Sequence, residues 1–259
     1  MSVDSRPVVL VTGAARRVGR AIALELAAHG FDVAVHSHRA SDESIDTLQA
    51  ARAAGARAEA FVADLADETA CRALLPAVAE RMGRIDAVVN NASRFEYDGA
   101  GDCSYASMAE HWQVNTAAPV LLAAALHQRL SGSSGRGCVV NLLDQKLWNP
   151  NPDHFSYTLS KAALEAATTL QAQAFAPTLR VVGVAPGVTL PSGPMDSAEF
   201  VRAHAMTPLR RSSTPEDVAR AVRFLIESPA ITGTTLLVDG GQHLSAQPRD
   251  VLFLAREGV

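Results

Sequence analysis

The sequence predicts an α/β fold in which about seven parallel strands form one doubly wound sheet with helices on both faces. Short β-branched runs alternate along the chain with amphipathic stretches of about 10–15 residues. Strands separated by such helices pair in parallel, because each crossover is right-handed. Aromatic residues make up only 5% of the chain whereas Ala, Val and Leu are abundant, which favours helix-on-sheet packing over a β-sandwich. Since no repeat or linker is found, we expect a single domain over residues 1–259.

The first half of the chain supplies four of the expected strands. Each is a short apolar run bounded by turn residues. The strands are Val8–Thr12, Asp32–His36, Ala58–Ala63 and Ala87–Asn90. The helices between them are expected at Arg17–His29, Ser41–Ala54 and Asp67–Met82. A glycine follows each helix, as is usual at a helix C-terminus.

The second half continues the alternation with a long helical region, Ser107–Leu130, which we expect to be interrupted near Pro119. A turn rich in Gly and Ser follows at Ser131–Gly137. The remaining strands are expected at Cys138–Leu143, Arg180–Ala185 and Leu236–Val238. The remaining helices are expected at Ser156–Phe175 and at Pro215–Glu227, which Thr214 is expected to cap.

Two segments near the C-terminus fall outside this alternation. Gly187–His204 is broken by Pro191 and Pro194, and we expect it to form a flap over the ends of the strands. The apolar run Val251–Leu254 is a hypothetical docking surface for a neighbouring subunit.

Charge and composition exclude several classes of function. A net charge of −4 and a pI near 6.1 argue against a general affinity for nucleic acid or anionic membranes. No window holds the roughly 20 apolar residues of a membrane span, and residues 1–7 lack the pattern of a signal peptide. The three cysteines are far apart, and no Cys/His cluster has metal-ligand spacing. We therefore expect a cytoplasmic protein that acts on small molecules and holds no metal.

A turn that contains glycine leads from the first strand directly into a helix. Its residues are Thr12-Gly13-Ala14-Ala15-Arg16-Arg17-Val18-Gly19. Gly13 permits the tight turn, and Gly19 allows the helix and the strand to pack closely. The helix N-terminus then offers free N–H groups and a partial positive charge to a pyrophosphate. Ordinary strand–helix turns carry similar glycines, so this segment alone does not identify a function.

The end of the second strand indicates which dinucleotide is bound. Proteins that bind NAD place a carboxylate there for the ribose hydroxyls, whereas the 2′-phosphate of NADP requires cations. Ser37, His38 and Arg39 follow this strand, and Asp32 lies at its start, too early to reach the ribose. Arg39, helped by His38 and by a hydroxyl of Ser37 or Ser41, therefore favours NADPH/NADP+. A solvated basic turn is the alternative interpretation.

Seven segments in order resemble motifs of the classical short-chain dehydrogenase/reductases, over essentially the whole chain. They are Thr12-Gly13…Gly19, Asp64-Leu65, Asn90-Asn91-Ala92-Ser93, Asn115, Tyr157-x-x-x-Lys161, Pro186-Gly187 and Asp239-Gly240-Gly241. The resemblance implies a single-domain Rossmann fold and a small-molecule substrate. It also implies a homotetramer with the helix Ser156–Phe175 at an interface.

The resemblance further implies a role for each matched residue. Asp64 and Leu65 would flank the adenine of the cofactor. The other cofactor-lining residues, which include the cover of the nicotinamide, would be Arg16, Arg17, Val18, Asn91, Ala92, Ser93, Tyr157, Lys161, Pro186, Gly187 and Val188. Asn115 would shape a proton relay through a kink in its helix.

Tyr157 and Lys161 are the expected catalytic pair. Residues four apart share one face of a helix, so the ammonium group would lie beneath the phenol. It would lower the phenol's pKa, which is about 10 when unperturbed. Tyr157 would then donate a proton to the substrate as hydride arrives, and Lys161 could also hold the nicotinamide ribose.

Two departures from the usual family pattern narrow the resemblance. Asp144 stands where most of the family has serine, and Arg17 stands where the turn usually has its middle glycine. With His38-Arg39 and with Phe95 just after Ser93, these residues resemble the pteridine reductases and bacterial dihydromonapterin reductases. The resemblance implies that Asp144 and Tyr157 deliver protons, while Arg17, Ser93 and Phe95 contact a pterin ring.

The chemistry of a carboxyl group fits this resemblance. An aspartate near the nicotinamide would repel a developing alkoxide unless it is protonated, whereas the nitrogen of a C=N bond must gain a proton. We therefore hypothesise hydride transfer to a C=N bond of a flat heterocycle. In the alternative interpretations, Asp144 caps the Asn149–Asp153 turn and Phe95 is a core residue under its loop.

Three other functions remain open. The first is an ordinary ketone or alcohol oxidoreductase of the same family. The second is a reductase of cyclic imines other than pterins. The third is a non-catalytic NADP(H) sensor, against which the intact Asn115, Tyr157 and Lys161 argue because a sensor needs no proton relay.

Overall fold

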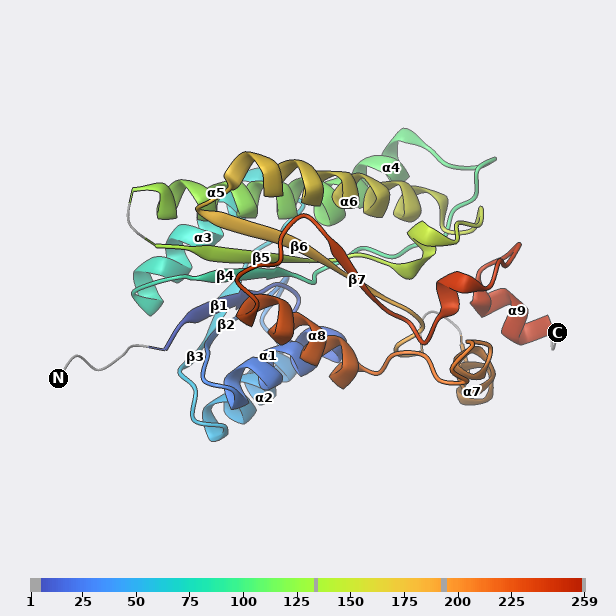
Figure 1. Ribbon diagram of the computed structural model, residues 1–259, viewed down its shortest axis with the longest axis horizontal. Coiled ribbons are helices and arrows are strands. Elements are labelled where there is room, and N and C mark those ends of the chain that lie inside the picture. The colour runs from blue at the N-terminus through green and yellow to red at the C-terminus, as the bar shows by residue number, and fades with distance from the viewer. Residues whose placement is uncertain (1–5, 133–134, 192–194, 258–259) are drawn as a thin grey trace.

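Seven strands form a single sheet in the computed structural model, which describes residues 6–132, 135–191 and 195–257 (Figure 1). The strands are β1 (Val8–Val11), β2 (Asp32–Ser37), β3 (Ala58–Val62), β4 (Ala87–Asn90), β5 (Gly137–Leu142), β6 (Leu179–Pro186) and β7 (Thr235–Val238). Their order is β3-β2-β1-β4-β5-β6-β7, and every pair is parallel. The predicted doubly wound parallel sheet is therefore confirmed, with each strand within one residue of its expected bounds.

Helices cover both faces of the sheet (Figure 1). The nine α-helices of the described residues are α1 (Arg17–Ala28), α2 (Asp42–Ala53), α3 (Glu68–Met82), α4 (Tyr105–Trp112), α5 (Ala118–Ser131), α6 (Phe155–Phe175), α7 (Ser197–Ala205), α8 (Pro215–Glu227) and α9 (Val251–Glu257). Helices α1, α2 and α8 lie on one face, and α3, α5 and α6 lie on the other. Because side chains alternate along a strand, β1 contributes Val9 and Val11 to one core and Leu10 to the other. A fully buried side chain of this size contributes about 1.5–3 kcal/mol.

The long helical region is interrupted, although not at the proline itself. A π-helical stretch, Gln113–Ala117, separates α4 from α5, and Pro119 lies in the first turn of α5. Proline is common in the first turn of a helix, because the N–H group that it lacks has no partner within the helix there. The interruption places Asn115 inside an irregular turn, completely buried.

The segment that we expected to be a flap contains a helix that the sequence analysis missed. Asp196 and Glu199 form a capping box at the start of α7. The flap is described on either side of residues 192–194, so the expected break at Pro194 lies outside the described residues. The same holds for residues 133–134 of the turn expected at Ser131–Gly137.

The hypothesis of subunit docking by Val251–Leu254 is wrong for its buried residues. Val251 and Leu252 lie in helix α9, and they are only 6% and 8% exposed. They pack in their own chain against Met195 and Ala203 of the flap. Val251 and Leu252 thus pack against the flap, whereas Phe253 and Leu254 are half-buried and docking through them stays a prediction.

Candidate active site

The turn after β1 is bonded to the end of the neighbouring strand β4. The Thr12 hydroxyl accepts hydrogen bonds from the backbone N–H groups of Asn91 and Ala92, at 2.9 and 3.0 Å. The Asn91 side chain donates to the carbonyls of Thr12 and Gly13, at 2.9 and 3.1 Å. The strand order reverses between β1 and β4, where open α/β sheets form their ligand crevice.

At two positions of this turn, which are occupied by glycines, a side chain would clash. Gly13 has a φ of +62°, and a Cβ on Gly19 would lie 2.2 Å from the carbonyl oxygen of Gly13. Arg16, the N-cap of α1, makes no side-chain cap, whereas Ser41 and Asp67 cap α2 and α3. The first N–H groups of α1 are therefore available to a pyrophosphate.

His36 is a residue of this turn that the sequence analysis did not single out. It is 1% exposed, and its Nδ1 accepts a hydrogen bond of 3.2 Å from the backbone N–H of Gly13. Its Nε2 lies 3.1 Å from the carbonyl oxygen of Ala63, so the neutral ring donates there. Burial lowers the pKa of His36 to about 4. His36 is thus a neutral structural support, and its position in the polar run at the end of β2 was the one available signal.

Ser37, the last residue of β2, has a structural role, whereas His38 and Arg39 directly after the strand are exposed and polar or charged. Ser37 is buried, and its hydroxyl donates to the Arg39 carbonyl at 2.8 Å, which shapes the turn. His38 lies 3.5 Å from the Asp64 carboxylate. The Arg39 guanidinium makes no ion pair with the part of the chain that the structure describes, whereas Arg16 lies 3.9 Å from Glu43. Arg39 is consequently the cation of this turn without a carboxylate partner among the described residues, and its contact with a 2′-phosphate stays a prediction.

Asp144, Tyr157 and Lys161 are brought together from β5 and α6. The Tyr157 hydroxyl donates to Asp144 Oδ2 at 2.8 Å. Asp144 Oδ1 accepts from the backbone N–H of Lys146 at 2.9 Å, which makes Asp144 the N-cap of the short helix Gln145–Trp148. Lys161 Nζ donates to the Leu142 carbonyl at 2.7 Å and lies 5.8 Å from the centre of the Tyr157 ring. One carboxylate oxygen of Asp144 therefore caps its loop, and the other meets the phenol.

Burial dominates the electrostatics of these three groups. Burial raises the pKa of Asp144, although its hydrogen bonds to Lys146 and Tyr157 oppose the rise. Burial lowers the pKa of Lys161 to about 8, against the attraction of Asp144. Burial and then the Asp144 carboxylate raise the pKa of Tyr157 well above its usual value. The expectation of a lowered Tyr157 pKa is therefore wrong for the chain alone, because burial, and after it the Asp144 carboxylate, raise this pKa.

Asn115 fixes the loop that follows β4. Its Oδ1 accepts from the Arg94 backbone N–H at 2.7 Å and from the Ser93 hydroxyl at 3.2 Å. Its Nδ2 donates to the Arg94 carbonyl at 2.9 Å and to the Ser160 hydroxyl at 3.0 Å. Asn115 thus joins the loop of Ser93 to helix α6, which carries Tyr157.

A cavity of about 210 Å³ opens beside the Asp144–Tyr157 pair, and Arg17 and Phe95 line it. Arg17 has a φ of +55°, at the position where the family usually has glycine, and its guanidinium donates to the Pro191 carbonyl of the flap at 2.9 Å. A residue other than glycine adopts this conformation at a cost of about 1–2 kcal/mol. Phe95 is 40% exposed, which excludes the core interpretation, and its ring meets that of Tyr157 edge-on at 4.7 Å.

The segment after β6 also lines this cavity. Gly187 and Val188 line it directly after Pro186, the last residue of β6. A Cβ on Gly187 would lie 2.6 Å from the Ser212 hydroxyl oxygen, and the Val188 N–H donates to Gln242 at 3.2 Å. The segment after β6 is therefore held closely against the turn that follows β7.

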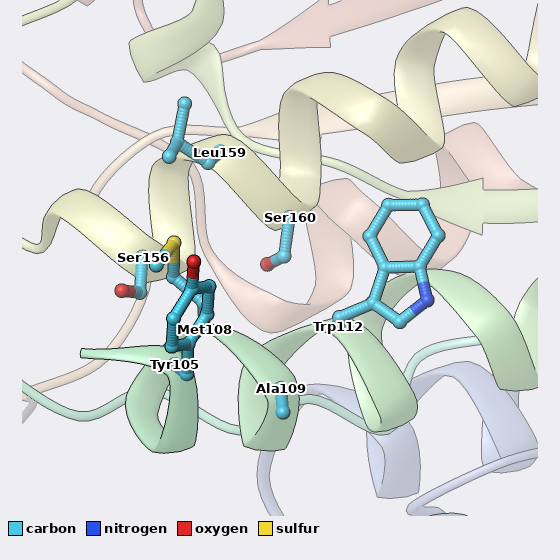
Figure 2. Close-up of a pocket in the computed structure, with 7 residues that line it drawn as sticks. All are labelled: Tyr105, Met108, Ala109, Trp112, Ser156, Leu159 and Ser160. Carbon is cyan, nitrogen blue, oxygen red and sulfur yellow. The ribbon is translucent and has the colours of Figure 1, made fainter. Parts of the chain in front are cut away.

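A second, more apolar cavity of about 430 Å³ lies between α4 and α6 and is drawn in Figure 2. Tyr105, Trp112 and Leu159 line it, and they are 92%, 51% and 47% exposed. Figure 2 shows Ser160 of helix α6 within the same group of residues. This face lies on the helix expected at a subunit interface, and that interface stays a prediction.

Neither a membrane span nor a metal centre is found among the described residues. None of their helices is long and apolar enough to cross a bilayer. In the same residues, no group of His, Cys, Asp and Glu is arranged to hold a metal ion.

Comparison with known proteins identifies the family. A family model described as enoyl-(acyl carrier protein) reductase matches residues 13–243. Among curated proteins, the chain is 35% identical to a protein of Streptomyces violaceoruber described as a ketoacyl reductase of granaticin polyketide synthase, over 92% of this chain and 96% of that one. It is 33% identical to pteridine reductase 1 of Leishmania tarentolae, over 92% and 97%.

A solved structure adds a match in three dimensions. The crystal structure of FolM alternative dihydrofolate reductase 1 from Brucella canis, complexed with NADP, superimposes with a TM-score of 0.89. It is 41% identical to this chain and covers 95% of it and 97% of the Brucella protein. With seven parallel strands, a glycine turn at the switch point and a Tyr157–Lys161 pair at the strand ends, the chain belongs to the short-chain dehydrogenase/reductase family.

Proposed function

We propose that the chain is an NADPH-dependent reductase that transfers hydride to a C=N bond of a pterin-like heterocycle, converting a dihydropteridine to its tetrahydro form. One observation carries the proposal: the Asp144 carboxylate lies 2.8 Å from the Tyr157 hydroxyl, where the family usually has serine. A neutral hydroxyl suits the oxygen of a ketone, whereas an acidic pair suits a nitrogen that must gain a proton.

The cofactor site fits NADP(H). Gly13 and Gly19 have no side chain that could block the approach of a pyrophosphate, and the first N–H groups of α1 are not capped by a side chain. Arg39 is free to bind a 2′-phosphate, and the similar Brucella protein was crystallised with NADP. When bound, NADPH supplies the hydride.

The chain's own residues supply the proton. Because its pKa is raised, Tyr157 is neutral at physiological pH and can donate its hydroxyl proton to the ring nitrogen. Asp144, whose pKa is also raised, can hold a proton and return it to Tyr157 through their hydrogen bond. Lys161, with a pKa of about 8, is mostly cationic at pH 7 and stabilises the negative charge that remains.

The cavity suits a flat, polar heterocycle. Phe95 presents an aromatic ring at its rim, and a stacked ring would gain about 0.5–1.5 kcal/mol beyond its burial. Arg17 also lines the cavity, and its guanidinium offers donors to a ring carbonyl. Pteridine reductase 1 and FolM, both similar to this chain, are named for pteridine and dihydrofolate reduction, which supports this substrate class.

The test is a substrate panel with purified protein. NADPH consumption is measured with dihydrobiopterin and dihydromonapterin, and in parallel with ketones and non-pterin cyclic imines. The proposal expects a kcat/KM at least tenfold higher for the dihydropterins. A clear preference for ketones would defeat the pterin assignment and leave a carbonyl reductase, the activity for which the Streptomyces violaceoruber relative is named.

We also infer a homotetramer in which α6 lies at an interface. The exposed apolar side chains between α4 and α6 support this inference, since such a patch is uncommon on a monomer. Light scattering should give the mass of four chains, and a Trp112→Glu variant should dissociate the assembly. A wild-type mass of one chain would contradict the inference.

A further inference from the structure

Lys146 is a buried cation immediately beside the proposed proton donors. The chain has 23 Lys and Arg residues, of which only Lys146 and Lys161 are lysines. Both are 3% exposed, and both lie within the site. Lysine carries a compact ammonium charge and arginine a planar guanidinium, so both buried cations of this site are ammonium groups.

Lys146 bonds in two directions. Its backbone N–H holds Asp144 Oδ1 at 2.9 Å. Its side chain donates to the Asp153 carbonyl and pairs with Asp250 Oδ2 at 3.3 Å. One residue thus connects the catalytic carboxyl group with a segment more than 100 positions further along the chain.

The segment reached by Lys146, residues 249–252, forms one wall of the substrate cavity. Asp250, Val251 and Leu252 line that cavity together with Asp144 and Tyr157. Further hydrogen bonds hold this wall, because Nε of Arg249 and the backbone N–H of Asp250 donate to the Asp153 carboxylate at 2.8 and 2.7 Å. The wall is therefore fixed to the loop between Asp144 and helix α6.

We propose that Lys146 and Asp250 are positioning residues for Asp144. Their ion pair ties the loop between Asp144 and helix α6 to residues 249–252, and it places two opposite charges near the Asp144 carboxyl group. The inference rests on the proposed function, because it takes Asp144 to hold a proton during turnover. It adds the C-terminal segment to the residues that determine activity.

The two members of the pair act on Asp144 with opposite signs. The other charged or titratable groups at this carboxyl are Tyr157 and Lys161 from α6 and Arg17 across the cavity. Burial is the main cause of the raised Asp144 pKa; the Asp250 carboxylate adds to the rise and the Lys146 ammonium opposes it. Removal of Asp250 should therefore lower the pKa of Asp144, and removal of Lys146 should raise it.

The pH profile of kcat tests this pair, with the substrate that the wild-type enzyme reduces best. The limb that is lost in Asp144→Asn identifies the Asp144 ionisation. We expect this limb to move to lower pH in Asp250→Asn and to higher pH in Lys146→Met. A loosened carboxyl group should also cost each variant about tenfold or more in kcat, with the Kd for NADPH within about twofold of wild type. Lys146→Arg keeps the charge and should keep the wild-type limb.

Glu68→Gln, which removes an exposed carboxylate of α3, is the control and should leave both kcat and the pH profile unchanged. Shifts of the limb in the same direction in both variants, or no shift in either, would overturn the proposal. If Lys146→Met does not fold, the isosteric Asp250→Asn decides, and a limb at its wild-type pH is the contradicting result. If the wild-type enzyme prefers ketones, the pterin assignment fails, and the same profiles with a ketone test the pair separately.

Discussion

The turn after β1 and the loop after β5 both border the cavity, but different forces hold them. The first turn is held by hydrogen bonds between backbone groups and the uncharged side chains of Thr12 and Asn91, and by two glycines at positions where a Cβ would clash. The second is held by pairs of ionisable side chains: Asp144–Tyr157, 13 residues apart, and Lys146–Asp250, 104 residues apart. Close packing and uncharged hydrogen bonds therefore hold the turn at the cofactor site, whereas ionisable side chains hold the loop at the proposed substrate site.

This difference indicates where the enzyme's specificity resides. A backbone cradle at a helix N-terminus binds any dinucleotide pyrophosphate, so it is common to many reactions. In the proposed mechanism, a carboxyl group whose pKa is raised by burial determines which substrate atom can be protonated. Substitutions on the first side should alter cofactor binding, and those on the second should alter chemistry.

The largest effect should come from removal of the phenol. Tyr157→Phe should lower kcat by about 10²–10⁴-fold, the usual value of general acid catalysis. NADPH binding should be nearly unchanged, because the hydroxyl faces Asp144. Turnover and fluorescence titration with NADPH measure the two quantities. Tyr105→Phe, at a tyrosine that is 92% exposed, is the control, and an unaffected rate in Tyr157→Phe would remove the proposed mechanism.

A methyl group on the cofactor side should instead weaken binding. In Gly19→Ala, the new Cβ would lie 2.2 Å from the Gly13 carbonyl oxygen. Overpacking of this kind costs about 1–3 kcal/mol, which corresponds to roughly 5–150-fold in the Kd for NADPH. Isothermal titration calorimetry measures this loss of affinity for NADPH. Gly132→Ala, where a Cβ meets open space, should bind normally, and equal affinity in the two variants would break the comparison.

Arg39 should determine the preference between the two dinucleotides. Arg39→Ala removes a charge-assisted contact worth about 1.5–3 kcal/mol to the 2′-phosphate, so the Kd for NADPH should rise about tenfold or more. The Kd for NADH should change little, and Arg72→Ala serves as an exposed control on α3. An unchanged ratio of the two affinities would favour the solvated basic turn.

The smallest effect is expected at the rim of the cavity. Phe95→Leu removes an aromatic contact worth about 1 kcal/mol, so KM for the dihydropterin should rise about fivefold while kcat changes little. Phe224→Leu on α8, at a phenylalanine that is 53% exposed, is the matched control. An unchanged KM would place the substrate away from Phe95.

Local patterns predicted most of the fold. Buried apolar runs gave the strands their positions within one residue, and α8 begins and ends as predicted because Thr214 and Pro215 mark its start. Helix α7 was not predicted, although Asp196 and Glu199 have the spacing of a capping box. The two prolines just before it favour an irregular segment instead. Helix α9 is short and depends on its contacts with α7, which no local pattern encodes.

The candidate site was predictable as a set of residues but not as a network. The motifs indicated Asp144, Tyr157 and Lys161, which the fold brings together. The raised pKa of Tyr157 could not be foreseen, because it depends on burial and on the distance to Asp144. The Lys146–Asp250 pair joins residues that are 104 positions apart, and a single sequence carries no signal for such a contact.

The central claim is that the Asp144 carboxyl group directs protonation to nitrogen. Asp144→Ser, which restores the usual residue of the family, tests it most directly when NADPH consumption is measured with a dihydropterin and with a ketone. We predict a loss of at least about 100-fold in kcat/KM for the dihydropterin, with equal or higher activity toward the ketone. An unchanged ratio of the two activities in the Asp144→Ser variant would contradict the claim.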